Sequence, residues 1–100
     1  MLDHSSLEIL LIEDEPAHAE LIQRAFEERT PSFHIEHVSL LSQARQYLSD
    51  KKPDLIITDW RLPDGDGLEL LSDRKNSFDA PVIFMTSYGS ERIAVEAITS

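Results

Sequence analysis

The sequence has no cysteine and only 9 basic residues among 100. Without cysteine it can hold neither a disulfide framework nor a thiolate zinc site. Its 19 acidic residues give a formal net charge of −10, which argues against direct binding to nucleic acid, because phosphate binding needs a basic surface. No apolar run approaches membrane-spanning length, and residues 1–6 lack the pattern of a secretory signal. We therefore expect one cytoplasmic domain with no direct nucleic-acid or membrane contact.

Apolar runs of strand length alternate with segments of helical periodicity, which predicts an α/β fold around a parallel sheet. Strands are expected at 7–13, 33–38, 55–59 and 82–86. Helices are expected to begin near Pro16, Ser39, Asp66 and Gly89. The apolar faces expected for these helices are Leu21, Ile22, Ala25 and Phe26; Leu41, Ala44, Tyr47 and Leu48; Leu68 and Leu71; and Ile93, Ala94, Ala97 and Ile98.

Acidic residues stand at the ends of two of the predicted strands. Glu13 and Asp14 follow the apolar run of the first strand, and Asp59 ends the third. Ligands of an open parallel sheet bind outside the carboxyl ends of its strands, so these three carboxylates are expected to converge. Their mutual repulsion is tolerable if a hard cation neutralises them, and an all-oxygen ligand set suits Mg²⁺. The sequence thus predicts an acidic magnesium pocket.

Three segments in this order and spacing resemble the receiver domain of two-component response regulators: LLIEDEP at 10–16, PDLIITDWRLPDGDGLELL at 53–71 and PVIFMTS at 81–87. The resemblance covers essentially the whole chain. It implies a flavodoxin-like, three-layer sandwich with strand order 2-1-3-4-5. Residues 1–100 are then expected to form one receiver domain that lacks the fifth strand and last helix, so that 89–98 is the fourth helix.

The same resemblance implies a role for each matching residue. Asp59 corresponds to the phosphoacceptor and Thr86 to the switch hydroxyl that responds to the phosphoryl group. Asp14, Asp59 and the backbone carbonyl of Arg61 correspond to direct Mg²⁺ ligands. Glu13, where the family often has aspartate, is expected to act through a metal-bound water.

In the family, a sensor histidine kinase or phosphotransfer protein supplies the phosphoryl group. The chain is therefore expected to be a signalling phosphoacceptor, with at most self-catalysed phosphoryl transfer and loss, and not an enzyme acting on a separate substrate. No lysine here matches the family's lysine at the end of its fifth strand, which leaves an alternative open: a non-phosphorylated interaction or dimerisation module. Under either interpretation we expect a homo-oligomer, because a missing fifth strand would expose the fourth as a sheet edge.

Overall fold

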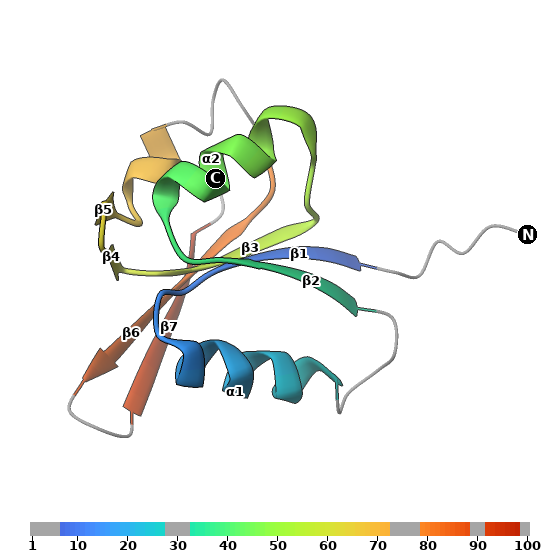
Figure 1. Ribbon diagram of the computed structural model, residues 1–100. Coiled ribbons are helices and arrows are strands. Elements are labelled where there is room, and N and C mark those ends of the chain that lie inside the picture. Colours follow the sequence, from blue (N-terminus) through green and yellow to red (C-terminus); the bar gives the residue numbers. More distant parts are fainter. Residues whose placement is uncertain (1–6, 28–32, 73–78, 89–91, 99–100) are drawn as a thin grey trace, which may run out of the picture.

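The computed structural model describes residues 7–27, 33–72, 79–88 and 92–98; for 86–88 and 92–98 only the backbone path is described. Strands and helices alternate through the first half of the chain, as the sequence predicts (Figure 1). The elements are β1 (Leu7–Ile12), α1 (Pro16–Glu27), β2 (Phe33–Val38), α2 (Leu41–Asp50), β3 (Leu55–Asp59), β4 (Arg61–Leu62), β5 (Gly65–Asp66), β6 (Val82–Tyr88) and β7 (Arg92–Ile98). Residues 69–72 are also helical. None of the described helices is long and apolar enough to cross a membrane.

The main sheet has the order β2-β1-β3-β6-β7. Its first four strands are parallel and correspond to the four predicted strands, so the predicted order is confirmed for them. The apolar runs 9–12 of β1 and 55–57 of β3 fit their central places, because a central parallel strand is covered on both faces. The alternating sequence of β2 fits its place at the edge.

The prediction of a helix over residues 89–98 is wrong for 92–98, and its first part, 89–91, lies outside the described residues. The segment Arg92–Ile98 is a strand, β7, which pairs antiparallel with β6 and takes the fifth place in the sheet. The apolar residues of this segment fit a helical and an alternating pattern almost equally well, and isoleucine and valine favour strands. Pairing also satisfies backbone groups of β6 that would otherwise lie at an open edge. The expectation that β6 is an exposed edge is therefore wrong as well.

Each face of the sheet carries its own apolar cluster, and one labelled helix covers each face (Figure 1). Successive residues of β1 point to opposite faces, so Leu10 and Ile12 face α2 while Ile9 and Leu11 face α1. The cluster beneath α2 is the larger; its buried members are Leu10, Ile12, Leu41, Ala44, Leu48, Ile56, Leu62, Leu70, Ala80, Val82 and Phe84. The three-layer prediction is confirmed by this arrangement.

The inner faces of the helices were predicted with mixed success. In α2 the predicted face is confirmed, with Leu41, Ala44 and Leu48 buried and Tyr47 half-buried. In α1, Leu21 is 60% exposed and Ala25 is also exposed. The residues of α1 that pack on the sheet are Ala19, Ile22 and Phe26.

The helix at 69–72 begins later than predicted, which changes which of its leucines are buried. Asp66 and Glu69 form half of a capping box, because Glu69 Oε2 accepts the Asp66 N–H at 3.2 Å. The side chain of Asp66 accepts the N–H of Leu68, at 2.9 Å from Oδ1. Leu68 therefore lies in the turn before the helix and is 38% exposed. Leu70 is fully buried in its place, and Leu71 is half-buried.

Candidate metal centre

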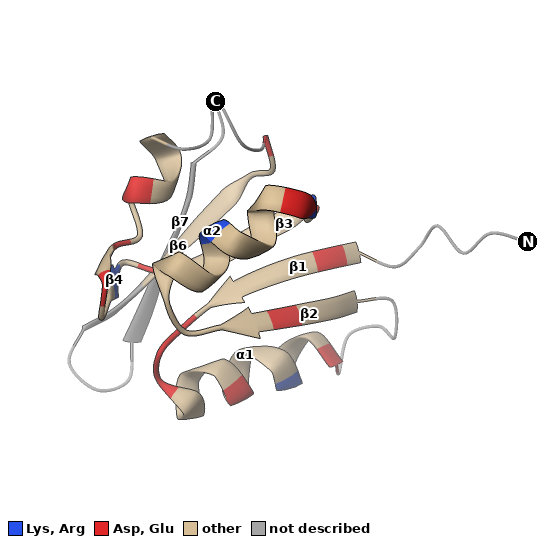
Figure 2. Cartoon of the chain, turned by 45° about the horizontal axis from the view of Figure 1, so that its top comes forward, with Lys and Arg blue, Asp and Glu red and all other residues tan. Residues whose placement is uncertain are grey.

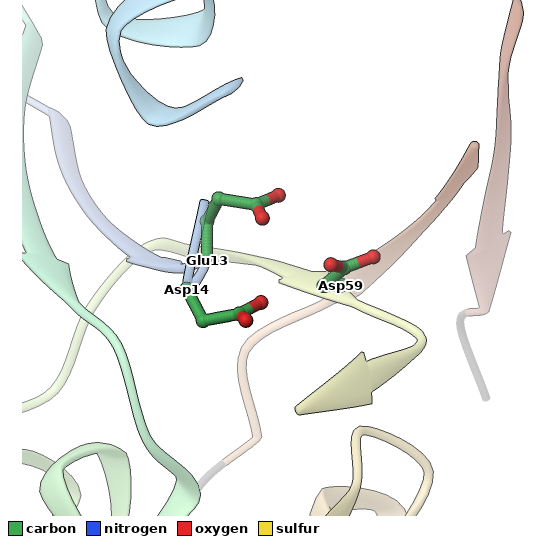
Figure 3. A group of neighbouring side chains, drawn as sticks. All are labelled: Glu13, Asp14 and Asp59. Carbon is green, nitrogen blue, oxygen red and sulfur yellow. The ribbon is translucent and has the colours of Figure 1, made fainter. Parts of the chain in front are cut away.

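The carboxyl ends of β1 and β3 lie side by side and bring the predicted acids together. Ile12 pairs with Thr58, so Glu13 and Asp59 are next in the same register. Glu13, Asp14 and Asp59 each offer a carboxylate oxygen, and these oxygens lie within 4.8 Å of one another (Figure 3). The segment between β1 and α1 is acidic throughout (Figure 2). The convergence expected from the sequence is present.

The backbone and the side chain of Glu13 are both held in place. Its N–H donates to the Val38 carbonyl at 3.0 Å, and its carbonyl lies 2.8 Å from Nε2 of His37. Because a carbonyl only accepts, the His37 ring donates here. The side-chain Oε2 accepts the Glu15 N–H at 3.0 Å. These contacts fix a carboxyl that is only 2% exposed.

Burial is the main cause that raises the pKa of Glu13 to about 7. The nearby Asp59 carboxylate raises this pKa further, whereas the Glu15 N–H and the His18 ring lower it. When no cation is bound, Glu13 is therefore the member of the three-carboxyl cluster that is partly protonated near neutral pH.

Burial also raises the pKa of Asp59, which is half-buried at the end of β3. The Trp60 N–H, 3.0 Å from Asp59 Oδ1, and a hydrogen bond from Glu13 oppose the rise, whereas the charge of Asp14 adds to it. Asp14 itself is exposed. The cluster thus contains one buried, one half-buried and one exposed carboxyl, and Asp59 remains open to an incoming group.

Thr86 and Arg61 lie near this centre along the backbone. Asp59 pairs with Met85 in the register between β3 and β6, and Thr86 is the next residue of β6. Arg61 begins β4, two residues after Asp59, and its side chain is exposed. The hydroxyl role of Thr86 and the ligand role of the Arg61 carbonyl stay predictions.

Two histidines belong to the centre, and the sequence did not single them out. His18, in the first turn of α1, places Nδ1 3.8 Å from Glu13 Oε2. His37, on β2, holds the Glu13 backbone through its Nε2. A signal for His18 exists, because it follows Asp14 by four residues at the start of a predicted helix. His37 gave no local signal, because its contact joins two strands.

The donor set fits a hard divalent cation. All three acids supply oxygen, the ligand atom that Mg²⁺ and Ca²⁺ prefer. The charges of Asp14 and Asp59 repel each other, and a cation would remove that repulsion. This acidic group lies at the carboxyl ends of two central strands, where open α/β sheets bind their ligands, and is therefore a candidate site for a divalent cation.

The chain belongs to the response regulator receiver domain family, whose family model matches residues 9–100. Methanogenesis regulatory protein FilR1 of Methanothrix harundinacea is 35% identical over 98% of this chain and 23% of its own length. Phosphate regulon transcriptional regulatory protein PhoB of Pseudomonas aeruginosa is 32% identical over 90% of this chain and 40% of its own. The chain therefore spans less than half of these relatives.

Solved structures agree with this assignment. The phosphorylated cyanobacterial phytochrome response regulator RcpA superposes with a TM-score of 0.73 and 30% identity, over 83% of this chain and 66% of that one. The MaeR response regulator bound to beryllium trifluoride gives a TM-score of 0.65 and 27% identity, over 84% of this chain and 70% of that one. The flavodoxin-like receiver fold and the signalling class of the protein are thereby established.

Proposed function

We propose that this receiver domain accepts a phosphoryl group on Asp59 from a sensor histidine kinase or phosphotransfer protein. The observation that carries the proposal is the convergence of Glu13, Asp14 and Asp59 within 4.8 Å, with Asp59 half-buried at the end of a central strand. Two similar solved structures support it, since that of RcpA is phosphorylated and that of MaeR is bound to beryllium trifluoride.

In the proposed step, a carboxylate oxygen of Asp59 attacks the phosphorus of the donor's phosphohistidine. The new O–P bond forms as the P–N bond breaks, and the electron pair stays on the imidazole nitrogen, which takes up a proton from solvent. The product on this chain is an acyl phosphate. A carboxylate is a weak nucleophile toward an anionic phosphoryl group, so positioning and charge neutralisation must supply most of the catalysis.

We propose Mg²⁺ as the cation, held by Asp14, Asp59 and the backbone carbonyl of Arg61, with Glu13 acting through a metal-bound water. When bound, it would neutralise the carboxylates and the phosphoryl oxygens. The residues of the chain do the rest. The Trp60 N–H orients Asp59 through Oδ1, and the contacts of Glu13 with Val38 hold the turn that carries Asp14.

Thr86 is proposed to respond to the new phosphoryl group with its hydroxyl, which would alter the segment that follows β6. Its place in the register, one residue beyond the partner of Asp59, supports this role. The exchange with the kinase is proposed to occur in the cytoplasm, as in the family.

The test is incubation of the protein with Mg²⁺ and acetyl phosphate, followed by intact mass measurement. We expect a mass increase of one phosphoryl group, stable in acid and released by hydroxylamine, as for an acyl phosphate. Asp59→Asn should abolish it, whereas Asp50→Asn, at the exposed end of α2, should not. An unmodified wild-type protein, or modification that persists in Asp59→Asn, would contradict the proposal.

We also propose that the chain self-associates. The sequence led us to expect association through an exposed edge of the fourth predicted strand, but β7 covers that edge of β6. In the sheet order, β7 is now the terminal strand after β6, so a second copy would pair along β7.

A further inference from the structure

The short hairpin that follows Asp59 is attached to the first turn of α2 by one carboxylate. Asp64, in the turn between β4 and β5, accepts the Leu41 N–H on Oδ1 at 2.8 Å and the Ser42 N–H on Oδ2 at 3.0 Å. These are among the N–H groups that a helix leaves without an internal partner. Leu40 is the N-cap residue of α2 and supplies no side-chain hydrogen bond; Ser39, near which the helix was expected to begin, lies one residue before it.

The packing beneath this contact leaves little freedom. Gly65 has a φ of +153°, and a Cβ added to it would lie 2.7 Å from Cδ1 of Leu41, a residue that is 1% exposed. Arg45 of α2 also forms an ion pair of 3.2 Å with Glu69, which follows the hairpin. Both side chains are exposed, and exposed ion pairs add little to stability. The hairpin is thus seated on α2 by Asp64 and by the close approach of Gly65.

The other end of the hairpin lies against the acidic centre. Gly67 donates its N–H to the Trp60 carbonyl at 2.8 Å. A Cβ added to Gly67 would lie 2.3 Å from the Asp59 carbonyl oxygen, so the two backbones are in close contact there. Arg61, the proposed carbonyl ligand, pairs with Asp66 inside the hairpin. The hairpin therefore connects the first turn of α2 to the proposed cation site.

Two-residue strands give the hairpin little stability of its own, because even an isolated full-length hairpin is marginal. Its position must come from its attachments. The Leu41 and Ser42 N–H groups lower the pKa of Asp64, which keeps this exposed carboxyl charged and bound to α2. Loss of Asp64 would release the end of the hairpin that lies away from Asp59.

We propose that Asp64 is a positioning residue of the cation site, one that acts through the hairpin on the Arg61 carbonyl and does not touch the cation. This inference rests on the proposed function, because it assumes that the acidic centre binds Mg²⁺. It assigns to the first turn of α2 a part in cation binding that the acidic cluster alone does not indicate.

The chain offers a matched control on the same helix. Gln43 Oε1 accepts the Ser39 N–H at 2.9 Å and the Leu40 N–H at 3.1 Å, so it also caps α2, but none of its hydrogen bonds is to the hairpin. Asp64→Ala and Gln43→Ala each remove two hydrogen bonds from the start of α2. Only Asp64→Ala detaches the hairpin, so a difference between the two variants isolates the positioning role.

The experiment is a calorimetric Mg²⁺ titration of the full chain, with Trp60 fluorescence as a second readout, at a temperature where circular dichroism shows every variant folded. We expect Asp64→Ala to weaken Mg²⁺ binding about tenfold, as for other outer-shell partners of metal ligands. Gln43→Ala should lower the thermal midpoint and leave the affinity unchanged. Asp64→Asn, which keeps one acceptor, should lie between, and it serves as the test if Asp64→Ala does not fold.

The inference would be overturned if Asp64→Ala and Gln43→Ala bound Mg²⁺ with equal affinity. If Asp64→Ala does not fold, a wild-type Mg²⁺ affinity in Asp64→Asn would overturn it instead. Asp59→Asn separates this failure from that of the proposed function. If wild type binds Mg²⁺ and Asp59→Asn does not, the cation site stands and only the role of Asp64 falls. If wild type binds no Mg²⁺, both fall.

Discussion

At the scale of single residues, Glu13 shows how burial and charge oppose each other in this site. Its carboxyl is 2% exposed, and burial together with the charge of Asp59 raises its pKa to about 7. A buried carboxylate is costly unless it is paired or bound to a cation. Below about pH 7 this carboxyl is therefore mostly protonated, and a cation that binds the site would compete with its proton.

Mg²⁺ affinity should consequently depend on the protonation of Glu13. Because the cation competes with the proton, affinity should fall by about tenfold for each pH unit below about 7 and level off above it. Titrations across this range test the prediction, and Glu13→Gln, which cannot ionise, should flatten the profile. A wild-type profile as flat as that of the variant would contradict it.

The same pKa predicts how stability changes with pH in the absence of a cation. The folded-state pKa lies above the ordinary value of 4.5, so the folded state binds the proton more tightly than the unfolded state. The contribution is fully present below 4.5 and is lost as pH rises through about 7. Urea unfolding at about pH 5 and about pH 8 should show wild type losing stability relative to Glu13→Gln over this range, and Mg²⁺ should restore it.

At the scale of elements, the β4–β5 hairpin shows what glycine contributes. Gly67 lies where its backbone meets that of Asp59, and its N–H binds the Trp60 carbonyl. A methyl group cannot fit 2.3 Å from the Asp59 carbonyl oxygen, so any other residue must move the hairpin or the end of β3. The glycine is required by packing, and its backbone freedom is secondary here.

Gly67→Ala should therefore destabilise the protein by about 1–3 kcal/mol, the usual range for overpacking, and should also weaken Mg²⁺ binding. Thermal unfolding and the cation titration measure the two effects. Ser72→Ala, an exposed change in the helix that follows, is the control and should alter neither. A Gly67→Ala protein with the wild-type midpoint would mean that the hairpin accommodates the methyl group without cost.

At the scale of the whole molecule, the sheet separates two apolar clusters, one beneath each labelled helix. The cluster on the α1 face is the smaller, with five buried members: Ile9, Leu11, Ala19, Ile57 and Met85. β2 and β7 are the outer strands of the five-stranded sheet. The proposed self-association belongs to this scale, because outer strands determine how one sheet can extend into another.

If copies pair along β7, the mean mass should rise above that of one 11.4 kDa chain as concentration increases. Light scattering across a wide concentration range measures this. Val95→Pro, which removes a backbone N–H and strains the strand, should shift the equilibrium toward the monomer. A monomeric mass throughout the range would refute self-association.

The order of the four parallel strands followed from the resemblance to receiver domains, whereas the sequence by itself determined the strands and the convergence of Glu13, Asp14 and Asp59. Local chemistry sufficed there, because apolar runs of strand length define the sheet and its carboxyl ends place the acids that follow them. The tertiary structure alone decided the rest. Residues 92–98 form a strand because β6 offers a pairing partner, Asp64 caps α2 from 23 residues away, and burial sets the charge of Glu13. Each of these features depends on residues that are far apart in the sequence and close in space, and local propensity does not determine which residues those are.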